Sequence, residues 1–132
     1  MRDLNPKNPF EWLRRARGDL IIAKNFSEHE GILLEDLCFH SQQATEKALK
    51  GVLVSLGLEF PRTHSITLLL ELITEINVEI PSELFEAGRL TFYAVQARYP
   101  GAYSEVEYDD YLEAVKIAEK VVDWAQEYIN NK

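Results

Sequence analysis

The side chains most able to do chemistry in this sequence are three histidines and a single cysteine: His29, His40, His64 and Cys38. No histidine has the second histidine or the paired glutamate at the spacing that zinc-protease or di-iron bundle sites need. Cys38 and His40 are two residues apart on one expected helix, so their side chains diverge and a buried thiol is the better interpretation. The six glycines are scattered singly and form no phosphate-binding loop. The sequence therefore predicts no metal site, no cofactor and no thiol nucleophile.

Arg98 is a stronger candidate, because it falls on the same helical column as Ala87, Thr91 and Ala94. That column is the expected inward face of its helix. A guanidinium group stays charged and is costly to bury alone, so it needs a carboxylate, carbonyl groups or an anionic ligand. Two interpretations remain open here: a structural cation near the carbonyls that end a helix, or an anion-binding residue.

A polar string inside a central helix, residues 42–50, is interpreted mostly as the outer face of that helix. Glu46 and Lys50 have the spacing of a solvent-exposed ion pair. A second polar stretch, residues 61–65, stands where another helix begins, so capping of free amides explains most of it. Within it, His64 is the imidazole that a turn positions best, and a ligand role for it is the minority interpretation.

Five helical segments must position these groups, because apolar residues recur every three or four positions in each. Asn8 is the expected cap of the first segment, Gly57 ends the second, Thr63 or Ser65 caps the third, and Pro100 ends the fourth. The expected ranges are about 8–26, 32–56, 65–76, 82–98 and 108–130. No segment of comparable length alternates as a strand should. We expect one all-α domain over residues 1–132, an up-and-down four-helix bundle with the short third helix added.

The composition limits the function classes further. The chain has 132 residues, 46% of them hydrophobic, which is enough to fold around a core without disulfides. One cysteine, no long apolar run and no secretion signal favour a cytoplasmic protein with no membrane contact. A net charge of −8 argues against a protein that coats duplex DNA.

The charge is unevenly distributed along the chain. Residues 1–24 carry a net charge of +3 and residues 104–132 a net charge of −5. A basic first helix could meet an acidic last helix, within the chain or across an oligomer. Two solvated faces are the simpler interpretation, and we prefer it.

Four motifs in this order resemble the HEPN domain, a nucleotide-binding domain of higher eukaryotes and prokaryotes. They are Trp12 with Ala16, Asp19 and Leu20; Gln43-Ala44-x-Glu46-Lys47-Ala48-x-Lys50; Thr63-His64-Ser65; and Ala97-Arg98-Tyr99-Pro100. The resemblance covers almost the whole chain. It implies a four-helix bundle with an extra short helix, a homodimer, and pairing with a minimal nucleotidyltransferase, often as a toxin–antitoxin couple.

The resemblance also implies a site. Many HEPN proteins are metal-independent ribonucleases that use an arginine followed by a histidine, and Arg98 matches that arginine. Tyr103 stands where the histidine is expected at the shortest spacing, and its pKa near 10 makes it a poor general base. The resemblance therefore favours a non-catalytic protein that binds a nucleotide or RNA. Arg98 would hold phosphate, Tyr99 or Tyr103 would stack on a base, and Lys47 and His64 would lie around the cleft.

Two alternatives stay open. The first is a divergent ribonuclease toxin in which His64 or Tyr103 replaces the missing histidine. The second is a purely structural dimeric partner subunit whose arginine makes an ion pair.

Overall fold

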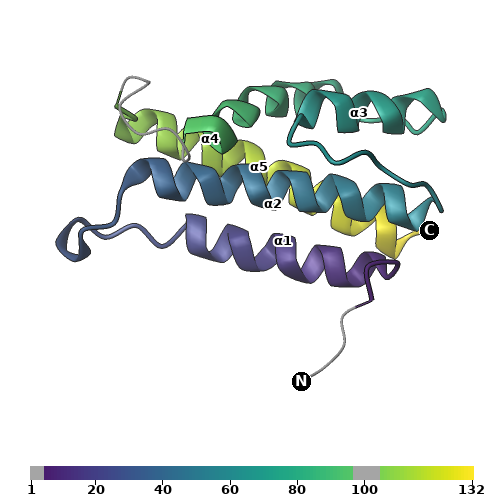
Figure 1. Cartoon of the computed structure of the whole chain (residues 1–132), viewed down its shortest axis with the longest axis horizontal. Coiled ribbons are helices and arrows are strands. Elements are labelled where there is room, and N and C mark those ends of the chain that lie inside the picture. The colour runs from purple at the N-terminus through teal and green to yellow at the C-terminus, as the bar shows by residue number, and fades with distance from the viewer. Residues whose placement is uncertain (1–4, 97–104) are drawn as a thin grey trace.

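The computed structural model describes residues 5–96 and 105–132 (Figure 1). Its regular elements are α1 (Pro9–Ala23), η1 (Glu28–Glu30), α2 (Leu34–Ser55), α3 (Ile66–Glu75), η2 (Ser82–Leu90), α4 (Thr91–Gln96) and α5 (Tyr108–Asn130), where η marks a 3₁₀ helix. No strand occurs within those described ranges, so the predicted all-α class is confirmed. None of the helices described is both long and apolar enough to cross a bilayer.

The long segments alternate in direction. Figure 1 shows α1 and α2 running in opposite directions and the η2–α4 segment running against α5. The start of α1 meets the end of α2, where a Cβ placed on Gly51 would lie 3.1 Å from Trp12 Cβ. The end of α1 meets the start of α5, where the Tyr111 hydroxyl donates to the Ala23 carbonyl at 2.7 Å. This alternation is compatible with the expected up-and-down bundle, in which α3 is the additional short helix.

Local sequence signals set most helix ends as predicted. The Asn8 side chain accepts a hydrogen bond from the amide of Phe10 at 3.0 Å and caps α1. Ser65 Oγ accepts from the amide of Leu68 at 3.2 Å and caps α3. Gly57 follows α2 with a φ of +73°, a left-handed conformation that glycine adopts without strain.

The fourth segment differs from its prediction. It was expected to be one α-helix, but residues 82–90 form the 3₁₀ helix η2 and only residues 91–96 form an α-helix. The backbone of η2 lies close to α3, because a Cβ on Gly88 would overlap the hydroxyl of Thr67. Of the expected inward column, Ala87 and Ala94 are buried, whereas Thr91 is only half-buried. The expected end of this segment, near Arg98, lies outside the described residues.

Helix α2 is the centre of the molecule, since it packs against α1, α3, η2, α4 and α5. Most of its buried residues form two adjacent stripes. The stripe with small side chains consists of Leu37, Ser41, Ala44, Ala48 and Val52, and the other of Cys38, Gln42, Thr45, Leu49 and Leu53. A helix buried on two sides leaves only a narrow strip for solvent. This polar strip carries the partly exposed Gln43, Lys47 and Lys50, next to the buried Gln42 and Glu46.

The basic first helix does meet the acidic last helix. Arg17 pairs with Asp123 at 3.0 Å, and Lys24 pairs with Glu119 at 2.9 Å. All four side chains remain substantially exposed, so each pair contributes roughly 0.2–1 kcal/mol. The basic and acidic helices thus contact each other through two ion pairs, although the charged side chains also remain partly solvated as we preferred.

Candidate functional site on helix α2

A cluster of polar side chains surrounds the carboxylate of Glu46, which is almost fully buried. Gln42 Nε2 donates to Glu46 Oε2 at 2.7 Å, and Lys50 Nζ lies 2.7 Å from Oε1. His64 Nδ1 lies 3.1 Å from Oε2. The amide of Gln43 donates in turn to the side-chain oxygen of Gln42 at 2.7 Å. The carboxylate is therefore held from two elements, α2 and the turn that precedes α3.

The sequence predicted a Glu46–Lys50 ion pair exposed to solvent, and the predicted exposure is wrong. The two residues do pair, but the side chains are only 5% and 13% exposed. The reason is tertiary: the segment after Gly57 folds back along α2, and the ammonium group of Lys50 lies 5.2 Å from the centre of the Phe60 ring. An aromatic ring and an imidazole thus cover a pair that helix spacing alone leaves open to water.

The electrostatics of the cluster keep Glu46 ionised. Burial alone would raise the pKa of its carboxyl group. Hydrogen bonds from Lys50, Gln42 and His64, together with the positive charge of Lys50, outweigh that effect and lower the pKa below its ordinary value. Glu46 is consequently a permanent acceptor near neutral pH, and it fixes the groups around it.

His64 is held at the mouth of this cluster by its own turn. Thr63 Oγ1 accepts from the Ser65 amide at 2.9 Å, and Ser65 caps α3, as the sequence predicts. These two bonds place the His64 imidazole against Glu46, while about half of its side chain stays exposed. The turn therefore positions the imidazole of His64, as the sequence indicated, and a ligand role for it stays a prediction.

Lys47 faces the other side of the strip, toward α1. Its Nζ lies 2.6 Å from Asp19 Oδ2, and His40 Nδ1 lies 3.0 Å from Asp19 Oδ1. Asp19 is nearly buried in the seam between α1 and α2. Glu46 and Lys47 thus lie at adjacent positions of α2 but belong to different clusters: Lys47 pairs with Asp19, whereas Glu46 is contacted by His64 from the turn before α3. Arg98, Tyr99 and Tyr103 lie outside the described residues.

Sequence reasoning missed the inward position of Gln42, Thr45 and Glu46. A signal for the first two was present, because they continue the buried stripe of Cys38, Leu49 and Leu53 at spacings of three and four. Thr45 satisfies its hydroxyl by donating to the Ser41 carbonyl at 2.9 Å. No comparable periodic signal marks Glu46, since its burial depends on the distant turn around His64.

Cys38 is buried, as predicted, and is no candidate nucleophile. Burial is the main cause that raises the pKa of its thiol to about 12, against a hydrogen bond with Tyr93 that lowers it. Burial likewise raises the pKa of Tyr93 to about 12. A thiol of this kind stays protonated at neutral pH. Within the described ranges, no three histidine, cysteine or acidic side chains gather in a way that could hold a metal ion.

The fold and site together define a class: a small all-α module whose central helix carries a polar strip between two buried carboxylates. Comparison with known proteins identifies the family. The sequence model of the HEPN domain matches residues 10–128, so the chain belongs to the HEPN domain family. The resemblance inferred from the motifs is thereby confirmed.

Two relatives support this assignment. A crystal structure of an archaeal HEPN homologue superposes with a TM-score of 0.71 at 32% sequence identity, covering 92% of this chain and 98% of that one. A protein of Methanocaldococcus jannaschii named "Putative toxin MJ1304" is 28% identical over an alignment of 140 residues that covers 92% of this chain and 88% of the relative.

The Glu46 cluster predicts a pH-dependent loss of stability. Glu46→Gln should lower the free energy of unfolding by about 2–3 kcal/mol at pH 7, because it leaves the shielded charge of Lys50 without its carboxylate. Since the folded-state pKa of Glu46 is lowered, its stabilisation is present above the ordinary carboxyl pKa and is lost as the pH falls through the folded-state pKa. The deficit of the variant should therefore shrink toward pH 3 in urea unfolding experiments.

The matched control is Glu75→Gln, on an exposed position of α3. It should change stability by no more than about 0.5 kcal/mol at either pH. Equal effects of the two substitutions, or a Glu46→Gln deficit that is constant with pH, would contradict the described role of Glu46.

Proposed function

We propose that this HEPN protein binds a nucleotide or a stretch of RNA at the polar strip of α2, without cleaving it. The observation that carries the proposal is a pair of neighbouring lysines, each paired with a buried carboxylate, with a histidine beside them in a protein of net charge −8. Lys47 and Lys50 lie on the strip with His64 beside them, and each lysine keeps part of its side chain exposed. Phosphate oxygens are the ligands that such clusters favour.

Arg98 is included in the proposed binding site because of its position in the sequence, shortly after α4 and within the family motif. The helix that leads toward it, α4, packs on α2 and ends at Gln96, two residues earlier in the chain. Arg98 matches the arginine of the family motif, and in this proposal it holds phosphate. Tyr103 occupies the position of the motif histidine, and a tyrosine is protonated at neutral pH. For that reason we assign Arg98, Tyr99 and Tyr103 to binding rather than to catalysis.

We also propose that the protein acts in a toxin–antitoxin-like module, as a homodimer with a minimal nucleotidyltransferase as its partner. Support comes from the family assignment and from the name of the archaeal relative, which describes that relative as a toxin. A homodimer would bring two polar strips into one assembly. The nucleotidyltransferase would either act on this protein or be inhibited by it.

Nucleotide binding can be measured directly. ATP, GTP and short single-stranded RNA should bind the wild-type protein, and Arg98→Ala should weaken that binding about 10- to 100-fold, the usual effect of losing a charged hydrogen bond. Isothermal titration calorimetry gives both affinities. Lys116→Gln, on an exposed position of α5, removes the same charge elsewhere and should leave binding unchanged. Binding that is absent, or identical in wild type and Arg98→Ala, would refute the proposal.

The partner can be tested by mixing. The protein alone should elute as a dimer of about twice the 15.2 kDa chain mass in size-exclusion chromatography with light scattering. With the purified product of the neighbouring gene, it should shift to a larger complex. A neighbouring gene that encodes no nucleotidyltransferase, or two proteins that elute separately at micromolar concentration, would remove this part of the proposal.

One observation favours the ribonuclease alternative. A carboxylate that contacts Nδ1 of an imidazole fixes the tautomer in which the other ring nitrogen accepts a proton, and Glu46 contacts Nδ1 of His64. His64 could therefore replace the missing motif histidine. We expect no cleavage when purified protein is incubated with RNA in the presence of a chelator. Cleavage that is lost in both Arg98→Ala and His64→Gln would establish a metal-independent ribonuclease and overturn the non-catalytic assignment.

A further inference from the structure

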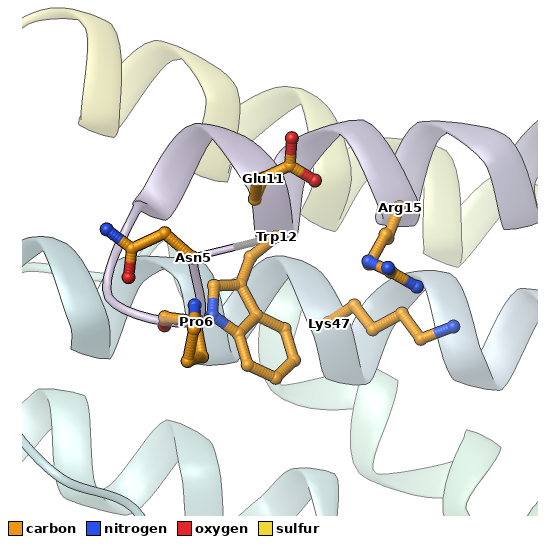
Figure 2. A pocket seen from close by; sticks show the side chains of 6 residues that line it. All are labelled: Asn5, Pro6, Glu11, Trp12, Arg15 and Lys47. Carbon is orange, nitrogen blue, oxygen red and sulfur yellow. Dashed lines mark hydrogen bonds between the residues drawn. The ribbon is translucent and has the colours of Figure 1, made fainter. Parts of the chain in front are cut away.

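A pocket of about 360 Å³ lies beside the polar strip, where the residues before α1 meet α1 and α2. It is lined by Asn5, Pro6, Glu11, Trp12, Arg15 and Lys47. Figure 2 shows Asn5 and Pro6 at one end, the cationic groups of Arg15 and Lys47 at the other, and the indole ring between them. The volume is at the lower end of the range for small-molecule sites. One nucleotide unit suits that volume better than an extended dinucleotide.

The indole of Trp12 is held in place from two sides. Its Nε1 donates to the Pro6 carbonyl at 2.8 Å. Its ring meets the edge of Phe60 with 5.5 Å between ring centres and an angle of 87° between the planes. Trp12 Cβ also faces Gly51, where an added Cβ would lie only 3.1 Å away. A large aromatic surface that is partly exposed and already fixed loses little conformational freedom when a ligand stacks on it.

The two cations at the other end of the pocket, Arg15 and Lys47, differ in whether a carboxylate balances their charge. Lys47 shares Asp19 with His40, so a carboxylate already balances its charge. Arg15 has no ion-pair partner in the part of the chain that the structure describes. Glu11, the one carboxylate in the lining, pairs with Arg14 at 3.1 Å, and Figure 2 shows its oxygens pointing away from the indole. The pocket therefore presents an aromatic surface next to a net positive charge.

We infer that this pocket is a subsite for one nucleotide unit, with the base against Trp12 and the phosphate between Arg15 and Lys47. The choice of a nucleotide as the ligand class rests on the proposed function. The positions of the base and the phosphate rest on the pocket itself. Its lining complements a planar ring with an anionic group next to it. A chain of contacts leads from the pocket toward His64. Phe60 contacts Trp12 on one side and Lys50 on the other. Lys50 pairs with Glu46, and Glu46 contacts His64. An RNA strand seated in the pocket would leave it along the polar strip.

The two tryptophans of the chain, Trp12 and Trp124, make a spectroscopic test possible. In a Trp124→Phe background, the fluorescence reports on Trp12 alone. Adenosine 5′-monophosphate should quench it, after inner-filter correction, at a concentration that saturates binding. Adenosine should bind about tenfold more weakly because it lacks the phosphate, and inorganic phosphate alone should quench nothing.

Substitutions should separate the two halves of the subsite. Arg15→Gln, at an exposed position that leaves the core intact, should weaken binding of adenosine 5′-monophosphate about tenfold in the same background. Lys116→Gln should leave it unchanged. Quenching should be absent in Trp12→Phe, where Trp124 is the remaining reporter. Circular dichroism confirms that each variant is folded.

The outcomes distinguish this inference from the proposed function. If Trp12 fluorescence does not respond while ATP or RNA still binds in an Arg98-dependent manner, the subsite is wrong and the proposed function stands. If no nucleotide or RNA binds by either method, both are wrong. Quenching that is equal for adenosine and its monophosphate, or unaffected by Arg15→Gln, would overturn the assignment of the phosphate to Arg15.

Discussion

The buried carboxylate of Glu46 is the constraint on which the site depends. An ionised group in the interior needs close partners of opposite charge or several donors, because it has lost its water. Here Lys50 and Gln42 come from the same helix, but His64 comes from a turn 18 residues further along. Satisfying one side chain of α2 therefore ties the segment after Gly57 to the face of that helix. The need of the Glu46 carboxylate for partners thus accounts both for the path of the segment after Gly57 and for how much of the polar strip stays exposed.

A second constraint acts on the opposite side of α2. The small side chains Ala44 and Ala48, with Gly51 beyond them, let α1 approach closely. That approach brings Asp19 within reach of Lys47 and places Trp12 against α2, so the same seam creates both the second charged cluster and the wall of the pocket. A larger residue at position 51 would press on Trp12 where the pocket forms, because even a Cβ there would lie only 3.1 Å from Trp12 Cβ. Packing and site are thus not independent features of this chain.

These two constraints explain how far the sequence alone leads. Helix ends depend on one or two adjacent residues, and Asn8, Gly57 and Ser65 therefore predicted them well. The all-α class followed from periodicity over whole segments. The burial of Glu46 could not be predicted, because the spacing of Glu46 and Lys50 is the same for an exposed pair and for a covered one. Its cover comes from a turn whose path is set by tertiary contacts. The pocket combines residues before α1 with residues from α1 and α2, and no local pattern joins such distant positions.

The same contacts decide how an acidic protein can hold an anion. Most basic side chains near the strip already have a carboxylate: Arg17 and Lys24 contact α5, Lys50 contacts Glu46, and Lys47 contacts Asp19. A phosphate arriving there shares these cations rather than neutralising free ones, so each contact contributes less than an unpaired cation would. Arg15 differs from these four residues, because it has no ion-pair partner within residues 5–96 and 105–132. Binding at this face should therefore depend on stacking and on a few shared cations. It should also decline with salt less steeply than binding by proteins that cover many phosphates.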